Sequence, residues 1–248
     1  MTALKRLLFP GLAALVALDI LVSLGVWQLY RLQWKEALIA RVTSRLAAPP
    51  IPAPGPEAWR GLDVAGLEYQ PVALRGHYHN DREVDVVYTL TEPHGPRGGV
   101  GYLVMTPFET DAGWYVYVDR GFVPADRKSA ASRTEGLIEG ATTVIGLVRR
   151  PHGRIWYMPG DNIAANQWFS RDPDLYARTY GLPPDKVAPY LVDARFDPAL
   201  PGGLPQGGET IIDFPNSHLQ YAITWFGLAA GLIGVFTVFA RRRLQASA

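Results

Sequence analysis

Near its N-terminus the sequence reads LLFPGLAALVALDILVSLGVWQL over residues 7–29, and near its C-terminus YAITWFGLAAGLIGVFTVFA over residues 221–240. Each stretch is long enough to cross the roughly 30 Å hydrocarbon layer of a bilayer as an α-helix. The first runs into aromatic and cationic residues instead of a small-residue cleavage site, so it is typical of a retained span and not of a signal peptide. These stretches predict a membrane protein with one transmembrane helix at each end.

The charges around the second span predict its orientation. Arg241, Arg242 and Arg243 follow the span directly, and Lys and Arg are absent from the span itself. Cationic residues next to a span favour the cytoplasmic side. We therefore expect both termini in the cytoplasm and the long middle segment outside it, in a periplasm or its mitochondrial equivalent.

The middle segment is predicted to be a mainly antiparallel β-domain, a small barrel or sandwich, with one short helix. Alternating β-branched or aromatic and polar residues mark the expected strands, which are 69–79, 83–90, 100–108, 114–122, 142–148 and 187–192. We expect the first two to form a hairpin around Asn80 and Asp81, and the next two to form another around Asp111–Gly113.

The one predicted helix spans residues 172–180, with Asp172 as N-cap, Pro173 in the first turn and Gly181 as the stop. Runs rich in Pro and Gly at residues 49–56 and 197–208 are interpreted as linkers. The sequence predicts three domains. Residues 1–46 form the first helix with an extension past the bilayer, residues 47–215 form the β-domain with its linkers, and residues 216–248 form the second helix.

Composition and motifs argue against several classes of function. A net charge of +1 with 19% charged residues leaves no basic footprint for nucleic acid. The absence of cysteine excludes thiolate metal sites and thiol–disulfide exchange. We found no nucleophile elbow, phosphate-binding glycine loop or His-Glu-x-x-His motif, so we do not expect an enzyme.

The residues after the first span form a distinctive helical face. Trp27, Arg31, Trp34 and Lys35 follow helical spacing, and Gln28 joins Arg31 and Lys35 on the adjoining face. One interpretation is an interfacial belt of aromatic rings and snorkelling cations. The other is a binding surface.

At the outer end of the second span, His218, Tyr221 and Trp225 share a face, and Asn216 precedes them. Because antiparallel helices bring their outer ends together, we expect His218 at the level of Trp27, Gln28 and Arg31. A histidine beside aromatic rings and cations can offer a haem an axial nitrogen, apolar walls and partners for its propionates. The alternative is an interfacial histidine that bonds to Asn216 or to lipid headgroups.

Four motifs spread along the chain carry a family resemblance. They are LGVWQLYRLQWK at residues 24–35, GYLVMTPF at 101–108, VDRGFVP at 118–124 and NSHLQYAITWF at 216–226. Together, and in this order between two spans, they resemble the surfeit locus protein one family. Asp119 and Phe122 depart from the pattern, because asparagine and tryptophan are usual there.

The resemblance implies an assembly factor for haem–copper cytochrome c oxidase. No arginine-rich, acid-poor presequence precedes the first span, so we expect a bacterial inner membrane in preference to a mitochondrial one. It implies that haem a is held by His218 as ligand to the haem iron and passed to the oxidase core subunit, with haem a synthase as a second partner. The remaining cofactor-site candidates are Trp27, Gln28, Arg31, Tyr221 and Trp225, and the partner-site candidates are Trp34, Lys35, Arg120, Gly121 and Asn216. The alternative function is a haem-free membrane scaffold that stabilises an oxidase assembly intermediate.

Three other positions leave alternatives open. Asp19 lies in the first span, where it would contact a client helix or bond within the hairpin beside a face of small residues that includes Gly227 and Gly231. Arg120 either contacts a partner or pairs locally with Asp119 or Asp126. His77 and His79 share one strand face, but no third metal ligand is evident, so we expect solvent exposure there.

Overall fold

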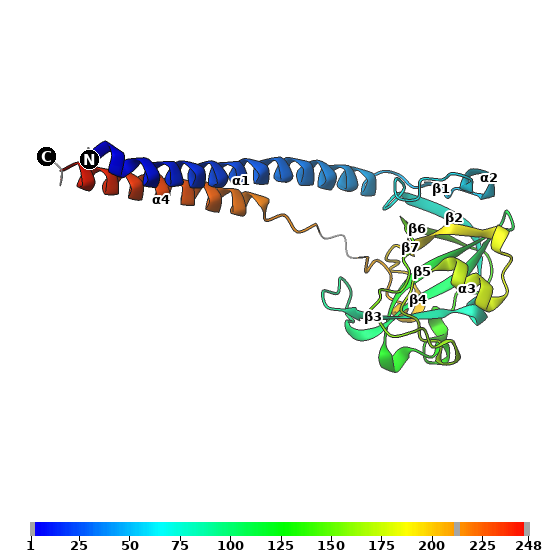
Figure 1. The fold of residues 1–248 in the computed structure, drawn as a ribbon. Coiled ribbons are helices and arrows are strands. Elements are labelled where there is room, and N and C mark those ends of the chain that lie inside the picture. The colour runs from blue at the N-terminus through cyan, green and yellow to red at the C-terminus, as the bar shows by residue number, and fades with distance from the viewer. Residues whose placement is uncertain (1–2, 211–213, 246–248) are drawn as a thin grey trace. The chain divides into compact units, whose positions relative to one another are not determined.

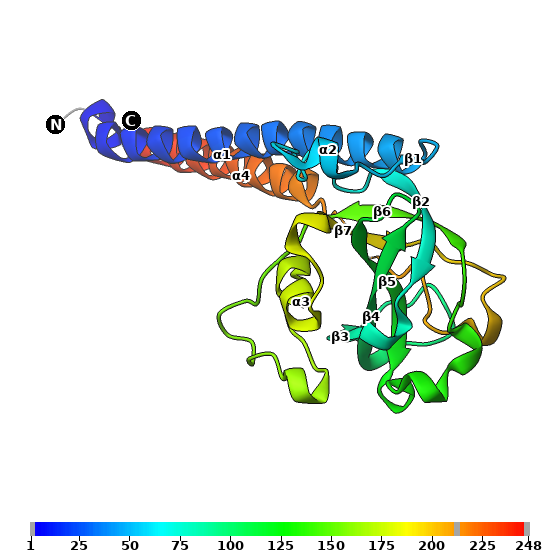
Figure 2. The same cartoon turned by 90° about the vertical axis from the view of Figure 1, so that its right-hand side faces the viewer.

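The computed structural model describes residues 3–210 and 214–245. The chain divides into two compact units, one made of residues 1–43 and 212–248 and the other of residues 44–211. Both views show helix α4 running beside α1, with the start of α1 and the end of α4 at the same end (Figure 1 and Figure 2). We call α1 and α4 together the helix hairpin.

Helix α1 spans Ala3–Leu46 and helix α4 spans His218–Gln245. Within the described residues, Leu7–Leu46 and His218–Gln245 are long and apolar enough to cross a membrane, judged by length and composition. This confirms the two predicted terminal helices and the extension of the first one to Leu46, and it fits a membrane protein.

The helix hairpin packs through one stripe on each helix. On α4 the most buried residues are Ala222 and Ala229, which lie seven residues apart and so face the same way. On α1 Gly25 is buried, and a Cβ atom there would lie 2.7 Å from the ring of Phe226. A glycine at this point lets the Phe226 ring approach the α1 backbone closely.

The β unit is a closed, mainly antiparallel barrel with added edge strands. Its strands are β1 (Ile51–Pro52), β2 (Pro71–Tyr78), β3 (Val84–Leu90), β4 (Gly99–Thr110), β5 (Tyr115–Pro124), β6 (Thr142–Arg149) and β7 (Val187–Ala194). The order is β1-β2-β6-β7-β5-β4-β3, and an additional β2–β4 pairing closes the barrel. Pairs β1–β2 and β5–β7 are parallel and the others are antiparallel.

Strand alternation divides most of the buried apolar side chains into two large clusters, and Val104, Val123 and Leu204 form a third, smaller one. Val116, Val118 and Val192 belong to a cluster with members on all five barrel strands, which is therefore the barrel interior. Tyr117 and Leu191, one residue away, pack on the outer face with Trp168 and with helix α3 (Pro173–Tyr180). Because β5 and β7 are covered on both faces, they carry continuous apolar runs.

Several predicted elements are confirmed. The β4–β5 hairpin turns at Gly113, whose φ is +80°. Helix α3 begins at the Asp172 cap, whose side chain accepts from the backbone of Asp174 and Leu175, and it ends at Gly181 with φ +67°.

Two predictions are wrong. Strands β2 and β3 do not form a hairpin, because β2 pairs with β6 and β4 while β3 pairs with β4. The run at 197–208 is not a simple linker, since Leu204 and Gln206 are buried and Gln206 pairs with the backbone of Phe122. The run at 49–56 holds β1 and reaches the start of helix α2 (Pro56–Trp59).

Candidate functional site

The end of the helix hairpin at which α4 begins brings His218 and Gln28 together. Nδ1 of His218, the first residue of α4, lies 2.8 Å from Oε1 of Gln28 on α1. The expected depth of His218, level with Trp27, Gln28 and Arg31, is thus confirmed, and the contact itself is with Gln28. With the amide oxygen as acceptor, Nδ1 carries the proton and Nε2 keeps its lone pair.

The α1 candidates divide between two faces. Gln28 and Lys35 are half-buried on the side toward the α4 segment, and the Lys35 ammonium lies 5.4 Å from the ring centre of Phe214. Trp27, Arg31 and Trp34 are exposed, and the Arg31 guanidinium stacks 4.6 Å from the ring centre of Trp34. The exposed group offers two indole rings and a cation on one surface.

The α4 candidates also divide. His218 and Trp225 are half-buried, whereas Tyr221 is 54% exposed and Asn216 is exposed before the helix begins. Imidazole with a fixed Nδ1–H, exposed aromatic rings and nearby cations suit an iron porphyrin, because metal-bound histidines commonly donate their other N–H to a fixed acceptor. These residues therefore fit a haem by their donor chemistry.

Asp19 and the small residues of α4 lie elsewhere. The Asp19 side chain is exposed, so a bond within the hairpin is not what the structure has. A Cβ added at Gly227, Gly231 or Gly234 would meet nothing within 4 Å. Of the two expected uses of this glycine face, packing within the hairpin is not what the structure has, since that contact uses Ala222, Ala229 and the Gly25–Phe226 approach. Packing against a client helix stays a prediction.

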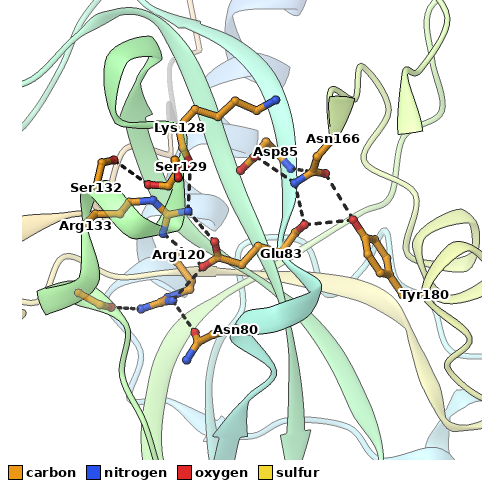
Figure 3. A network of polar contacts seen from close by, with 11 residues as sticks. Asn80, Glu83, Asp85, Arg120, Lys128, Ser129, Ser132, Arg133, Asn166 and Tyr180 are labelled. Atoms are coloured by element: carbon orange, nitrogen blue, oxygen red, sulfur yellow. Dashed lines mark hydrogen bonds and ion pairs between the residues drawn. The ribbon is translucent and has the colours of Figure 1, made fainter. Parts of the chain in front are cut away.

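In the β unit, Arg120 is buried inside a polar network. Its Nη1 donates to Oδ1 of Asn80 at 3.0 Å, its Nη2 donates to the carbonyl of Gly136, and its guanidinium stacks 4.6 Å from the ring centre of Tyr78. Figure 3 shows Glu83 between Arg120 and a second buried cation, Arg133, which lies 2.5 Å from Oε2 of Glu83.

The Arg120 side chain is only 3% exposed. Of the two alternatives, the structure therefore has the local pairing. The partners of Arg120 are Asn80, Glu83 and Gly136, and not the expected Asp119 or Asp126. Arg120 can contact another protein only if this network opens. Burial raises the pKa of Tyr78 to about 12, although Arg120 opposes the shift. Both groups keep their usual charge states at neutral pH.

Gly121 has a backbone role. Its φ is +122°, and a Cβ atom there would lie 2.0 Å from the carbonyl oxygen of Gln206. The neighbouring Phe122 exchanges two backbone hydrogen bonds with Gln206, of 2.9 and 2.8 Å. Glycine is therefore required at this position so that the 204–207 segment can pair with β5.

A second buried network surrounds Asp119. The Asp119 carboxylate accepts from the backbone of Gly121 at 2.9 Å and from Arg171 at 3.1 Å, and Arg171 also bonds to Asp193. Burial raises the pKa of Asp119, and the charge of Arg171 opposes this. Sequence reasoning missed both networks, because Glu83, Arg133, Arg171 and Asp193 belong to no recognisable motif.

His77, in β2, and His79, just after β2, have a third neighbour that the sequence did not reveal. His77 and His79 both approach the Glu109 carboxylate of β4, and the three groups offer ligand atoms that all lie within 4.8 Å of one another. The expectation of no third ligand is wrong. The signal was hidden because His77 and Glu109 become neighbours only through the barrel-closing β2–β4 pairing.

Comparison with known proteins identifies the family. The SURF1 family model matches residues 15–230. Surfeit locus protein 1 of Homo sapiens is 38% identical over 219 residues, which cover 84% of this chain and 70% of that protein. The Rattus norvegicus protein is 36% identical over 89% of this chain and 72% of its own length, and a SURF1-like protein of Monosiga brevicollis is 33% identical over 89% and 83%. On this match, which includes the whole barrel and part of each terminal helix, the chain belongs to the SURF1 family.

Proposed function

We propose that this protein is a membrane-bound assembly factor for haem–copper cytochrome c oxidase and that it holds haem a on His218 for transfer to the oxidase core subunit. Membership of the SURF1 family supports the assembly role. The His218–Gln28 contact supports the haem role, because a held Nδ1–H leaves Nε2 as the free donor nitrogen.

The other residues of this end would have supporting roles. Trp27 and Tyr221 offer exposed aromatic surface for a porphyrin face, and Arg31 offers a cation for a propionate. Haem a, if bound here, would supply an iron that the free Nε2 of His218 would ligate. Trp34, Lys35 and Asn216 remain candidates for contact with the core subunit or with haem a synthase.

The orientation belongs to the same proposal. Arg241, Arg242 and Arg243 favour a cytoplasmic end for α4, so the β unit would face the periplasm of a bacterium or the equivalent mitochondrial compartment. Reporter fusions at both termini should be active only as cytoplasmic reporters. A fusion within the β unit that is active in the cytoplasm would overturn this orientation.

The haem role is tested by co-expressing the full chain with a haem a synthase and recording the spectrum of the purified protein. We expect haem a absorbance that His218→Ala abolishes. His94→Ala, which changes a loop histidine of the β unit, should leave it intact. Equal haem content in the His218 variant would overturn the proposed ligand.

The haem-free scaffold makes the opposite prediction in cells. If His218→Ala removes haem from this protein but leaves oxidase activity in the membranes near wild type, assembly does not depend on the bound haem. The scaffold is then the better account. If oxidase activity falls with the haem content, carriage of haem is the function that matters.

A further inference from the structure

A cluster of metal-ligand residues, His77, His79 and Glu109, lies on the outer face of the barrel. His79 Nε2 is 2.8 Å and His77 Nε2 is 3.4 Å from the same Glu109 carboxylate oxygen, Oε2. The side chains are partly open to solvent, with exposed fractions of 49% for His77, 24% for His79 and 28% for Glu109. An ion from solution can therefore reach all three.

The fold positions these side chains through the pairing that closes the barrel. His77 is the direct partner of Glu109, and Tyr78 is the partner of Phe108. The ring centres of Tyr78 and Phe108 lie 4.9 Å apart in the barrel interior, so strand alternation turns His77, His79 and Glu109 outward. The backbone N–H of His79 also donates to Pro107 at 2.9 Å, which fixes the second histidine.

Two neighbours hold the Glu109 carboxylate in place. His79 Nε2 lies 2.8 Å from its Oε2, and Tyr115 on β5 also forms a side-chain hydrogen bond with it. The Tyr115 ring centre lies 5.7 Å from that of His79. An outer residue that bonds a ligand and holds its orientation is a regular feature of metal sites.

We propose that His77, His79 and Glu109 bind one divalent first-row transition-metal ion such as Zn²⁺. Two imidazoles and one carboxylate are a donor set that such ions accept, with a fourth position left for water. Ligand bonds of about 2.1 Å in a tetrahedral site place neighbouring ligand atoms about 3.4 Å apart. The His77–Glu109 separation of 3.4 Å already has this value.

The position of the site suggests what the metal would do. The β2–β4 pairing consists of three residue pairs, Gly76–Thr110, His77–Glu109 and Tyr78–Phe108, and it is the pairing that closes the barrel. An ion bound by residues of both strands would cross-link this short β2–β4 pairing. Since the three ligands come together only in the closed barrel, metal binding would stabilise the folded state.

The test uses the full chain in detergent, purified without a histidine tag and freed of metal with a chelator. Titration with Zn²⁺ alone, followed by calorimetry, should show one site per chain. The double change His77→Ala with His79→Ala should weaken binding at least tenfold, as should Glu109→Gln. Zn²⁺ should raise the melting temperature of the wild type but not of these variants.

His94→Ala is the matched control, because His94 Nδ1 also lies near a carboxylate, 3.5 Å from Glu209, but outside the cluster. It should bind Zn²⁺ as the wild type does. The proposal is overturned if the wild type binds no more tightly than the double variant, or if His94→Ala weakens binding equally. Should the double variant fail to fold, the near-isosteric Glu109→Gln decides alone.

Discussion

Gln28 and His218 are 190 positions apart in the chain, yet their side chains meet at 2.8 Å and join the two helices of the hairpin. The contact does two things at once. It fixes the imidazole orientation at the start of α4, and with the amide oxygen as acceptor it selects the tautomer whose Nε2 is free. A single amide thus links the packing of two transmembrane helices to the chemistry proposed for their outer end.

Replacing Gln28 with leucine should therefore weaken haem binding without removing the ligand itself. Loss of a residue that orients a metal-bound histidine commonly costs 10- to 100-fold in affinity. We expect Gln28→Leu to reduce haem a affinity by about tenfold or more in a spectroscopic titration. Gln33→Leu, at an exposed position on the same helix, should have no effect, and an equal loss in both variants would contradict this role for Gln28.

The Gly25–Phe226 approach predicts a second effect, this time on hairpin stability. A Cβ atom at Gly25 would lie 2.7 Å from the Phe226 ring, so Gly25→Leu should force the helices to repack at a cost of about 1–3 kcal/mol. Gly227→Leu makes the same chemical change where nothing lies within 4 Å. Denaturation of the two variants in micelles measures how much the Gly25–Phe226 contact contributes to the free energy of unfolding. Equal stability of both would show that Gly25 does not set the helix approach.

The sequence predicts features that depend on local chemistry. The two spans follow from apolar length alone, helix α3 from the Asp172 cap and the Gly181 stop, and the β4–β5 turn from Gly113. In each case the residues that determine the structure are neighbours in the chain. The level at which His218 meets α1 was predictable for a related reason, because two antiparallel spans that cross the same bilayer bring their corresponding ends to the same depth.

Features that depend on distant pairing could not be predicted. Because β2 and β3 are consecutive in the chain, the sequence predicts that they pair as a hairpin. In the structure β2 pairs with β6 and β4 instead. The same pairing brings Glu109 to His77, and the fold of the 204–207 segment onto β5 explains Gly121. Arg120 was open to two interpretations because burial decides between them, and burial is a property of the whole barrel.

Gly121 should be intolerant of even the smallest side chain. Gly121→Ala places a methyl group 2.0 Å from the Gln206 carbonyl oxygen at a φ of +122°, so we expect a loss of about 3 kcal/mol or more in unfolding free energy. Gly113→Ala, at φ +80° with nothing within 4 Å, carries the backbone strain alone and should cost about 1 kcal/mol. Urea denaturation of the full chain measures both, and a smaller loss at Gly121 than at Gly113 would contradict the steric argument.

Asp85 should make folding stability depend on pH. Burial raises the pKa of this carboxyl to about 6, with Glu83 acting in the same direction and Lys128 and Arg133 against it. In the unfolded chain an aspartate titrates near its ordinary value of about 3.9. The folded state therefore holds the Asp85 proton more tightly, and this group contributes a loss of stability as pH rises from about 4 to about 6.

The variant Asp85→Asn should remove this contribution. Asn166 donates to Oδ2 of Asp85 at 3.0 Å, and an asparagine side-chain oxygen can accept the same bond. The difference in unfolding free energy between about pH 4.5 and pH 7 should change by on the order of 2 kcal/mol relative to wild type. Asp126 is an exposed carboxylate directly after β5, so Asp126→Asn should leave the dependence of stability on pH unchanged. A profile that is identical in wild type and Asp85→Asn would mean that the buried carboxyl titrates as it does in water, despite its place beside Glu83.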